Sequence, residues 1–175
     1  MISQKLINRL KNQDETAFEA VYHETKHAVY AMVISIVRDR FLAEDIMQDT
    51  YIKMLRNIQS YKRRYKFINW LLTIAKNTAL DSLRANRSTV NVDPGDNDDL
   101  FISKDASVEK KMLSEYYLSL IPKDQQQIVL LRVVGDLKHK DIASIMEMPL
   151  GTVTYLYQKA LSTMRENSKE VDDNA

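Results

Sequence analysis

Residues 136–166 read DLKHKDIASIMEMPLGTVTYLYQKALSTMRE, and this stretch predicts two helices joined by a tight turn. The first helix is expected over about residues 138–146, the turn around Pro149 to Gly151, and the second helix directly after the turn. Both segments carry apolar side chains at helical spacing that would face inward: Ile142, Ala143, Met146, Val153, Tyr157, Ala160 and Met164. The turn chemistry and the two apolar faces therefore agree on a helix-turn-helix.

The second helix of this motif has a polar side that could meet a partner. Hydroxyl, amide and ammonium groups on such a helix can reach base edges and phosphates in the major groove of DNA. A helical hairpin that binds no DNA is the alternative. The candidates for duplex recognition are Thr152, Thr154, Tyr155, Gln158 and Lys159.

The few helix breakers of the chain mark its organisation. Pro122 is placed as the first-turn proline of a new helix, and Pro94-Gly95 lies in the turn-rich stretch VDPGDNDD. Between residues 93 and 109 six acids face one base, which is typical of a flexible linker. We find no strand periodicity. The sequence predicts an all-α chain with a helical domain over 1–87, an acidic linker over 88–108, a smaller helical domain over 109–168 and an acidic tail over 169–175.

Composition narrows the class of protein. The chain has no cysteine, which excludes disulfides and thiolate chemistry and fits a reducing cytoplasm. No apolar run is long enough to span a bilayer, and the N-terminus lacks an export signal, so we expect no membrane insertion. The net charge of +1 hides a basic block, because residues 53–87 hold nine bases and one acid. A basic block beside an acidic linker favours the interpretation that the protein binds nucleic acid.

An acidic patch precedes the basic block, in the segment FLAEDIMQDTYIKM at residues 41–54. Helical spacing gives it an apolar face that would point inward: Ala43, Ile46, Met47, Thr50, Tyr51, Met54, Leu55 and Ile58. The opposite side gathers Glu44, Asp45, Gln48, Asp49 and Ile52. A merely solvated face is equally compatible with the charges, but an apolar Ile52 beside acids favours a docking surface for a basic partner. Acid–base catalysis by the carboxylates lacks a nucleophile or a glycine-rich loop to accompany it.

The basic block mixes aromatic rings with cations in SYKRRYKFINWLLTIAKNTALDSLRANR, residues 60–87. Rings can stack on unpaired bases while cations contact the phosphates. A helix from about Phe67 would leave Asn69, Thr73, Lys76, Asn77, Arg84 and Arg87 on a polar side that could lie along DNA. The alternative makes Trp70 a core residue and the charges a solvated edge. The candidates for nucleic-acid contact are Tyr61, Arg63, Arg64, Tyr65, Phe67, Trp70, Lys76, Asn77, Arg84 and Arg87.

One further motif, HETKH at residues 23–27, matches the H-E-x-x-H pattern of zinc proteases. A zinc protease also needs a third ligand and a substrate-aligning strand. Glu44 belongs to the acidic patch, and Lys26 places a cation inside the motif. A chance match is therefore the favoured interpretation, and we expect neither a metal nor a cofactor. His139 is interpreted as structural or solvent-facing.

Four segments together resemble the bacterial sigma factors of the sigma-70 family, in particular the small extracytoplasmic-function group that keeps regions 2 and 4. They are AEDIMQDTYIKM, WLLTIAKNTALDSLR, LIPKDQQQIVLLR and DIASIMEMPLGTVTYLYQKAL, and they occur in the order and at the spacing of the family. The resemblance covers almost the whole chain and implies a transcription initiation factor that makes and breaks no bond.

The resemblance also implies partners and roles. The acidic patch would dock on the clamp helices of the β′ subunit of core RNA polymerase, with the β subunit as a further partner. The segment from Tyr61 to Trp70 would capture bases of a melting −10 element, with Asn77 and Arg84 along its duplex edge. The last helix would read the −35 element, the linker would run through the polymerase, and an anti-sigma factor would restrain the protein.

The last helix departs from the family pattern. Leu156, Lys159 and Leu161 stand where the family usually has arginines, which predicts a weaker electrostatic grip on the −35 element and a larger share for Tyr155 and Gln158. A stand-alone helix-turn-helix repressor remains the second interpretation, but it would leave the acidic patch around Asp45 without a role.

Overall fold

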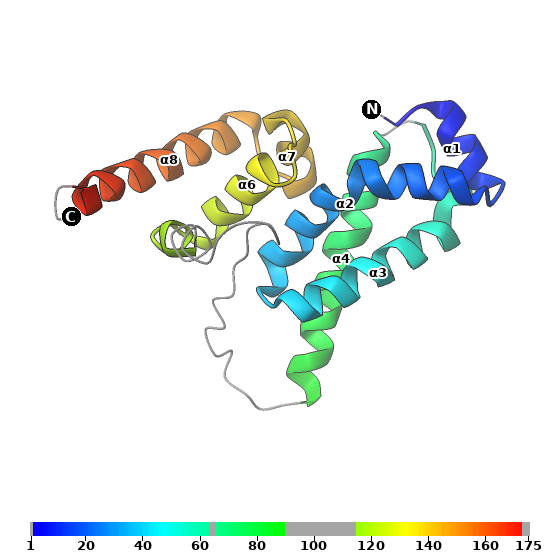
Figure 1. Cartoon of the computed structure of the whole chain (residues 1–175), viewed down its shortest axis with the longest axis horizontal. Coiled ribbons are helices and arrows are strands. Elements are labelled where there is room, and N and C mark those ends of the chain that lie inside the picture. Colours follow the sequence, from blue (N-terminus) through cyan, green and yellow to red (C-terminus); the bar gives the residue numbers. More distant parts are fainter. Residues whose placement is uncertain (1, 64–65, 90–114, 173–175) are drawn as a thin grey trace.

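The structure is a computed structural model that describes residues 2–63, 66–89 and 115–172, and every regular element within these residues is helical (Figure 1). The N-terminal half contains α1 (Gln4–Lys11), α2 (Glu15–Val37), α3 (Arg40–Asn57), the 3-10 turn η1 (Ile58–Ser60) and α4 (Phe67–Thr89). The C-terminal half contains α6 (Lys123–Val133), α7 (His139–Met146) and α8 (Leu150–Asp172), preceded by helical residues 115–119. The predicted all-α fold is confirmed.

The helix-turn-helix is α7 and α8, but its turn begins earlier than predicted. Glu147 ends α7 in the left-handed conformation, with φ of 58°. The backbone N–H groups of Glu147 and Met148 both donate to the carbonyl of Ala143 and close the turn. Pro149 follows, and Gly151 already belongs to α8. The turn is therefore made by a non-glycine residue with positive φ, not by Gly151.

Two predicted boundaries also change. Helix α4 continues through Thr89, so the predicted linker starts inside a helix and the rest of it, from residue 90, lies outside the described residues. Helix α8 runs to Asp172, so the tail predicted from residue 169 begins as helix. Apolar periodicity ends before these positions, and helix propensity carries the backbone further.

The long helix α2 organises the N-terminal half, because α1, α3 and α4 all pack against it. Its fully buried side chains include Val21, Val29, Met32 and Val33. Inside this core the hydroxyls of Thr25 and Tyr51 are hydrogen-bonded at 2.8 Å. Burial raises the pKa of Tyr51 to about 12, so this phenol stays neutral and joins α2 to α3.

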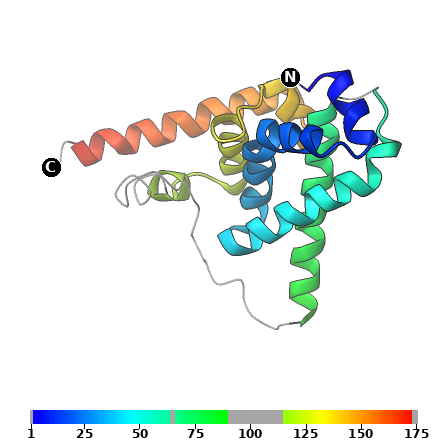
Figure 2. The same cartoon turned by 45° about the vertical axis from the view of Figure 1, so that its right-hand side comes forward.

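The two halves share a hydrophobic core. Helix α6 packs on α2, and α7 packs on α4 (Figure 2). Ile128, Leu131 and Ile142 from the C-terminal half belong to the same buried cluster as Met32 and Leu72 from the N-terminal half. The chain is thus folded back on itself, with the helix-turn-helix against the N-terminal domain.

Among the described residues, no helix combines the length and apolarity that crossing a membrane requires.

Candidate protein-docking and nucleic-acid interfaces

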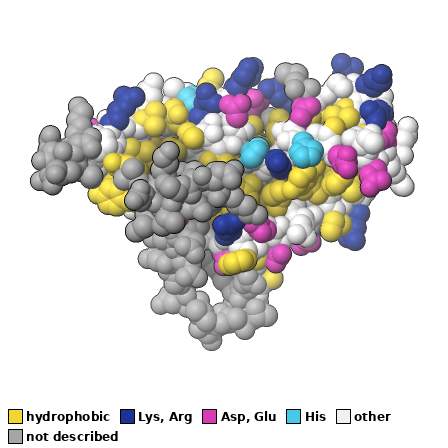
Figure 3. All heavy atoms as spheres, viewed as in Figure 1, with side chains coloured by type: hydrophobic (Ala, Val, Ile, Leu, Met, Phe, Trp, Pro, Cys, Tyr) yellow, Lys and Arg dark blue, Asp and Glu magenta, His cyan; other side chains and the backbone are white. Residues whose placement is uncertain are grey.

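Helix α3 presents the predicted acidic patch to solvent. The Asp39 side chain caps the helix by accepting the Leu42 N–H at 2.9 Å, and the inward face buries Ala43, Ile46 and Met54. All five residues of the patch are exposed: Glu44, Asp45, Gln48, Asp49 and Ile52. Figure 3 shows acidic and hydrophobic side chains side by side along this helix. We call these five residues the docking surface.

The structure adds two apolar residues to this surface. Phe41 is 81% exposed, and Leu55, which the periodicity placed in the core, is also exposed. The spacing of positions 41, 45, 48, 52 and 55 repeats at three and four residues, so these side chains form one stripe along α3. The sequence did not reveal that Phe41 and Leu55 are exposed, because apolar residues are normally expected on the buried face of a helix. The four-residue spacing between Phe41 and Asp45 was a usable signal, since it places both side chains on one face.

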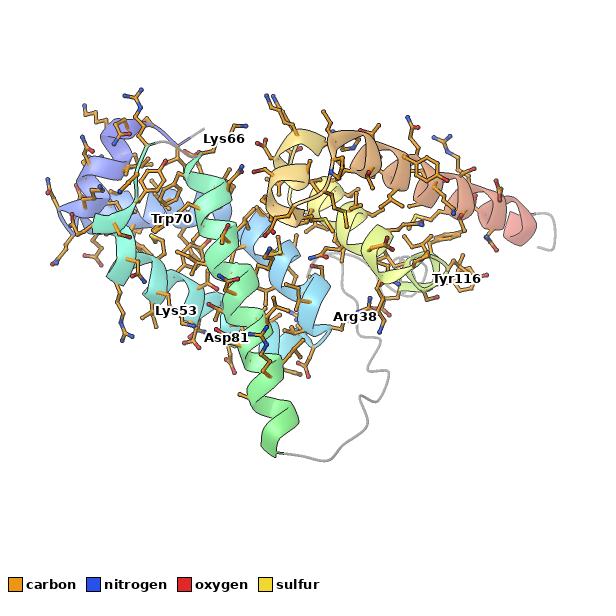
Figure 4. All side chains as sticks on the ribbon, turned by 180° about the vertical axis from the view of Figure 1, so that it is seen from behind. Arg38, Lys53, Lys66, Trp70, Asp81 and Tyr116 are labelled. Atoms are coloured by element: carbon orange, nitrogen blue, oxygen red, sulfur yellow. The ribbon has the colours of Figure 1, made fainter. Side chains whose placement is uncertain are left out.

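Three aromatic rings meet at the start of α4. The ring centroids of Tyr61, Phe67 and Trp70 lie 5.2–5.6 Å apart in pairs. Tyr61 and Phe67 are only 7% and 5% exposed, and burial raises the pKa of the Tyr61 phenol, whereas Trp70 is half-buried. The faces of Tyr61 and Phe67 are therefore not available to a base in this form of the chain. Among these three rings, Trp70 is the one with an accessible part (Figure 4).

Two lysines, the exposed Lys66 just before α4 and the half-buried Lys76 on it, contact the helix-turn-helix, whereas the sequence predicted Lys76 to face DNA. Lys66 pairs with Asp141 at 2.5 Å, and Lys76 pairs with Glu147 at 3.1 Å. Arg84 is exposed and lies 3.3 Å from Asp81, and Asn77 is exposed. Lys76, which the sequence placed against DNA, is thus held by the helix-turn-helix.

Other predicted residues of this interface are only partly described. Arg63 is exposed, whereas Arg64 and Tyr65 lie outside the described residues. The backbone of Arg87 is helical, and its side chain is not described. Asn69 keeps its side-chain oxygen buried and without a hydrogen-bond partner.

Helix α8 presents its predicted polar side openly. Thr152, Tyr155, Gln158 and Lys159 are exposed, and Tyr155 reaches 60%. Thr154 is half-buried, and its hydroxyl donates to the Leu150 carbonyl at 3.0 Å. The opposite side buries Val153 and Ala160, which fixes the rotation of the helix. The five residues predicted for duplex recognition therefore come together on one face.

The histidines do not assemble a metal centre. His23 and His27 are exposed on α2, and no group of three potential ligands lies close enough to hold a metal among the described residues. His139 packs edge-on against Tyr157 at 4.8 Å, a structural contact inside the helix-turn-helix. The zinc-protease alternative therefore has no third ligand in the described part of the chain.

Comparisons with known proteins agree with this geometry. Residues 21–89 match the family model for sigma-70 region 2, and residues 115–164 match the model for sigma-70 region 4. The RNA polymerase sigma-H factor of Pseudomonas aeruginosa is 29% identical over 86% of this chain and 85% of that protein. The ECF RNA polymerase sigma factor SigK of Mycobacterium tuberculosis is 27% identical over 91% of this chain and 90% of that protein.

Two solved structures share the fold. CnrH, in complex with the cytosolic domain of CnrY, aligns over 97% of both chains with a TM-score of 0.67 and 14% identity. The sigma factor RpoE of Bartonella quintana, in complex with the anti-sigma factor NepR, aligns over 81% of this chain and 90% of RpoE, with a TM-score of 0.62 and 24% identity. With both family regions matched in order, and with relatives covered along nearly their whole length, the chain belongs to the extracytoplasmic-function group of sigma-70 factors, which direct RNA polymerase to promoters.

Proposed function

We propose that this sigma factor divides its task among three helices: α3 docks on core RNA polymerase, α4 contacts the −10 element and α8 reads the −35 element. The observation that carries the proposal is the exposed stripe of acids and apolar side chains on α3. Folding leaves Asp45, Gln48 and Ile52 unburied on the outer face of a helix whose inner face is fully packed.

The chemistry of the docking surface fits a basic, partly apolar partner. Carboxylates steer and orient such a partner, while buried apolar contacts at the centre supply most of the binding energy. Phe41 and Leu55 extend the surface at both ends, and we include them in it. We assign its partner as the clamp helices of the β′ subunit, with the β subunit contacting the protein elsewhere.

At the −10 element, we assign base stacking to Trp70. Tyr61 and Phe67 hold its indole ring from the inside, because their own faces are packed. Stacking on an aromatic ring contributes about 1–3 kcal/mol per base, which offsets the cost of unstacking that base from the duplex. Arg63, Asn77 and Arg84 are exposed near this helix and would contact phosphates and base edges. We assign Arg64, Tyr65 and Arg87 to the same interface.

At the −35 element, the exposed face of α8 would enter the major groove. It carries one cation, Lys159, among hydroxyl, amide and phenol groups. Leu156 packs partly against the core, and its aliphatic side chain offers a phosphate no cation. The face therefore relies on Tyr155 and Gln158 for base edges more than on charge.

The solved neighbour RpoE is bound to an anti-sigma factor, and we extend this mode of control to the present chain. The protein would act in the cytoplasm, where the polymerase is, and would catalyse no reaction itself. A resident metal or cofactor has no place in this proposal.

The test is transcription in vitro on fragmented genomic DNA, with core polymerase and the purified protein, followed by mapping of RNA 5′ ends. Core polymerase alone gives the background. We expect new start sites that share upstream elements, and we expect Asp45→Ala combined with Gln48→Ala to remove them. The matched control is Glu19→Ala, which removes one exposed acid from α2 outside the docking surface.

Other outcomes are equally clear. New starts that persist in the Asp45 and Gln48 variant would refute the docking surface. An absence of new starts, together with tight duplex binding by the protein alone, would replace the proposal with a helix-turn-helix repressor.

A further inference from the structure

The short helix α1 packs beside the segment that leads into α4. Its inner face buries Ile7 and Leu10, which are 3% and 1% exposed, and the helix contacts α2 and η1. The Ser3 hydroxyl caps its N-terminus by accepting the Leu6 N–H at 3.2 Å. The match to sigma-70 region 2 begins at residue 21, so α1 lies outside it.

The turn between α1 and α2 is fixed by polar contacts. The Arg9 guanidinium lies 2.8 Å from the Asp14 carboxylate and also donates to the Thr16 hydroxyl. The Asp14 carboxylate in turn caps α2 by accepting the Ala17 N–H at 3.1 Å. Together with its buried apolar face, these bonds hold α1 on the central helix of the N-terminal half.

Lys11, the last residue of α1, bonds twice to the connection between α3 and α4. Its ammonium donates to the Tyr61 carbonyl at 3.2 Å, and its own carbonyl accepts from the Gln59 side-chain amide at 2.7 Å. Carbonyls at a helix C-terminus lack partners within the helix, so the Gln59 amide also satisfies the end of α1. Lys11 is half-buried, and hydrogen bonds from charged donors are stronger than those between neutral groups.

The contacts continue from Tyr61 to the accessible tryptophan. The Tyr61 N–H donates to the Ile58 carbonyl at 3.2 Å, so both backbone polar groups of Tyr61 are held. The buried Tyr61 ring contacts the Trp70 indole, with ring centroids 5.2 Å apart, and Phe67 packs on both rings. Figure 4 shows Trp70 near the start of α4, towards the end of the molecule where α1 lies. A continuous series of contacts therefore leads from α1 through Tyr61 to Trp70.

We propose that Lys11 is a positioning residue for the −10 interface: it holds the Tyr61 backbone, with support from Gln59, so that the Tyr61 ring keeps Trp70 oriented for stacking on a base. This inference rests on the proposed role of Trp70 at the −10 element. A ring that is already ordered loses less conformational freedom when a base stacks on it. The hydrogen bond at Tyr61 therefore raises the affinity for the unpaired strand without touching it.

The first measurement is the fluorescence of Trp70, which is the only tryptophan in the chain. In the purified full-length protein, Lys11→Met should raise the quenching constant of this fluorescence by acrylamide, because the indole moves more and meets solvent more often. Lys11→Arg keeps a charged donor at this position and should restore the wild-type constant. The matched control is Lys5→Met, which removes an exposed cation from the same helix.

The second measurement is transcript yield with core polymerase at a promoter found by the start-site mapping. Lys11→Met should lower the yield about three- to tenfold relative to Lys5→Met, because the net contribution of one hydrogen bond corresponds to a factor of this size. In a Trp70→Ala background, the same change should lower the yield less than about twofold, because a residue that acts through Trp70 has no further effect once the ring is absent.

A second variant guards against misfolding of the Lys11 variant. Gln59 is exposed, so Gln59→Ala removes the other hydrogen bond of this pair without opening the core. It should change the quenching constant and the yield in the same direction as Lys11→Met, by a smaller amount.

A raised quenching constant, together with a loss of yield that shrinks in the Trp70→Ala background, would support the proposal. Equal fold losses in both backgrounds would overturn it, since Lys11 would then act on folding or on polymerase binding. Unchanged quenching in both Lys11→Met and Gln59→Ala would also overturn it. An absence of transcription by the wild-type protein would refute the proposed function. An unchanged yield for Trp70→Ala alone would refute the −10 role of Trp70 and this inference with it.

Discussion

The two helices proposed to contact DNA, α8 and α4, are in opposite situations. On α8 four of the five predicted contact residues are exposed, and the fifth, Thr154, is half-buried. At α4 and just before it, Lys66 and Lys76 pair with the helix-turn-helix, and the predicted stacking rings Tyr61 and Phe67 are buried. A sequence pattern of cations and rings therefore indicates which groups can meet DNA, whereas the fold decides when they are accessible.

The difference follows from what each helix covers. Helix α8 buries one side against α6 and α7 and leaves the other to solvent. Helix α4 contacts α2 and α3 on one side and α7 on another. The part of α4 around Lys76 is therefore covered by α7, whereas Asn77 and Arg84 are exposed.

The largest expected effect comes from replacing an aromatic residue in each of the two DNA-contacting helices and comparing the losses of transcription. Trp70→Ala should lower transcription roughly 10- to 100-fold, because a stacking contact of about 1–3 kcal/mol is lost as the −10 element melts. Tyr155→Ala on α8 should lower it several-fold, since duplex contacts are shared among five residues. Transcript yield at fixed polymerase concentration measures both. Trp70→Phe should recover most of the activity, and equal losses for Trp70→Ala and Tyr155→Ala would contradict the assignment.

Two glycines, one on the covered side of the C-terminal half and one on its open side, allow a comparison of unfolding free energies. Gly135 lies on the covered side, where an added Cβ would come 2.7 Å from the Leu131 carbonyl oxygen. Gly135→Ala should therefore cost about 1–3 kcal/mol of unfolding free energy. Gly151 lies on the open side, with no atom within 4 Å of an added Cβ. Gly151→Ala should add about 0.5–1 kcal/mol by restricting the unfolded chain. Urea unfolding measures both, and a neutral Gly135→Ala would show that the chain relieves the close approach to the Leu131 carbonyl without cost.

A pair of lysines tests the comparison through salt dependence. Lys159→Gln should reduce the salt slope of duplex binding by about one, as expected for the loss of one phosphate contact. Lys76→Gln should leave the slope of the isolated protein unchanged, because Glu147 already neutralises this lysine. Binding titrations between about 50 and 200 mM salt provide the slopes. Equal slope changes would mean that Lys76 is accessible in the isolated chain.

The smallest expected effect is on the melting temperature and concerns the ion pair between Arg9 and Asp14, which lies within one half and not between the halves. A hydrogen bond from Arg9, then bonds from Thr16 and the Ala17 N–H, hold the pKa of Asp14 well below its usual range. Because the folded pKa is lowered, the stabilisation is present at neutral pH and is lost as the pH falls below the ordinary carboxyl range. Asp14 is partly exposed, so solvent screening keeps the contribution modest.

Asp14→Asn keeps the capping oxygen and should lower the melting temperature slightly at pH 7, with the difference from wild type vanishing at strongly acidic pH. A difference in melting temperature that persists at acidic pH would point to a cause other than charge.

Much of this architecture could be predicted from the sequence. Periodicity predicted most of the buried residues of α3 and the exposed position of Ile52, because an amphipathic helix has one way to bury its apolar stripe. It also predicted both helices of the helix-turn-helix. Leu55 was misplaced because an apolar residue at the border of a stripe can turn either way. The turn at Glu147 was missed because a non-glycine residue with positive φ gives no signal in the sequence.

The contact between the halves could not be predicted. Lys66 and Asp141 are 75 residues apart, and their pairing depends on how the complete domains pack. Lys76 was predicted to contact DNA because it is positively charged. The same positive charge lets it pair with the Glu147 carboxylate. Periodicity describes one helix at a time, so it does not tell which other helix will neutralise its cations.

Glu147 performs two tasks that make opposite demands on the residue. Its backbone, at φ of 58°, forms the turn before α8, where asparagine or glycine is more comfortable, while its carboxylate holds Lys76. Glu147→Asn would relax the turn and shorten the side chain that reaches α4. A screen for heat-resistant variants at position 147 is therefore expected to return proteins whose turn is more stable. The same proteins would have lost the contact between the Glu147 carboxylate and Lys76.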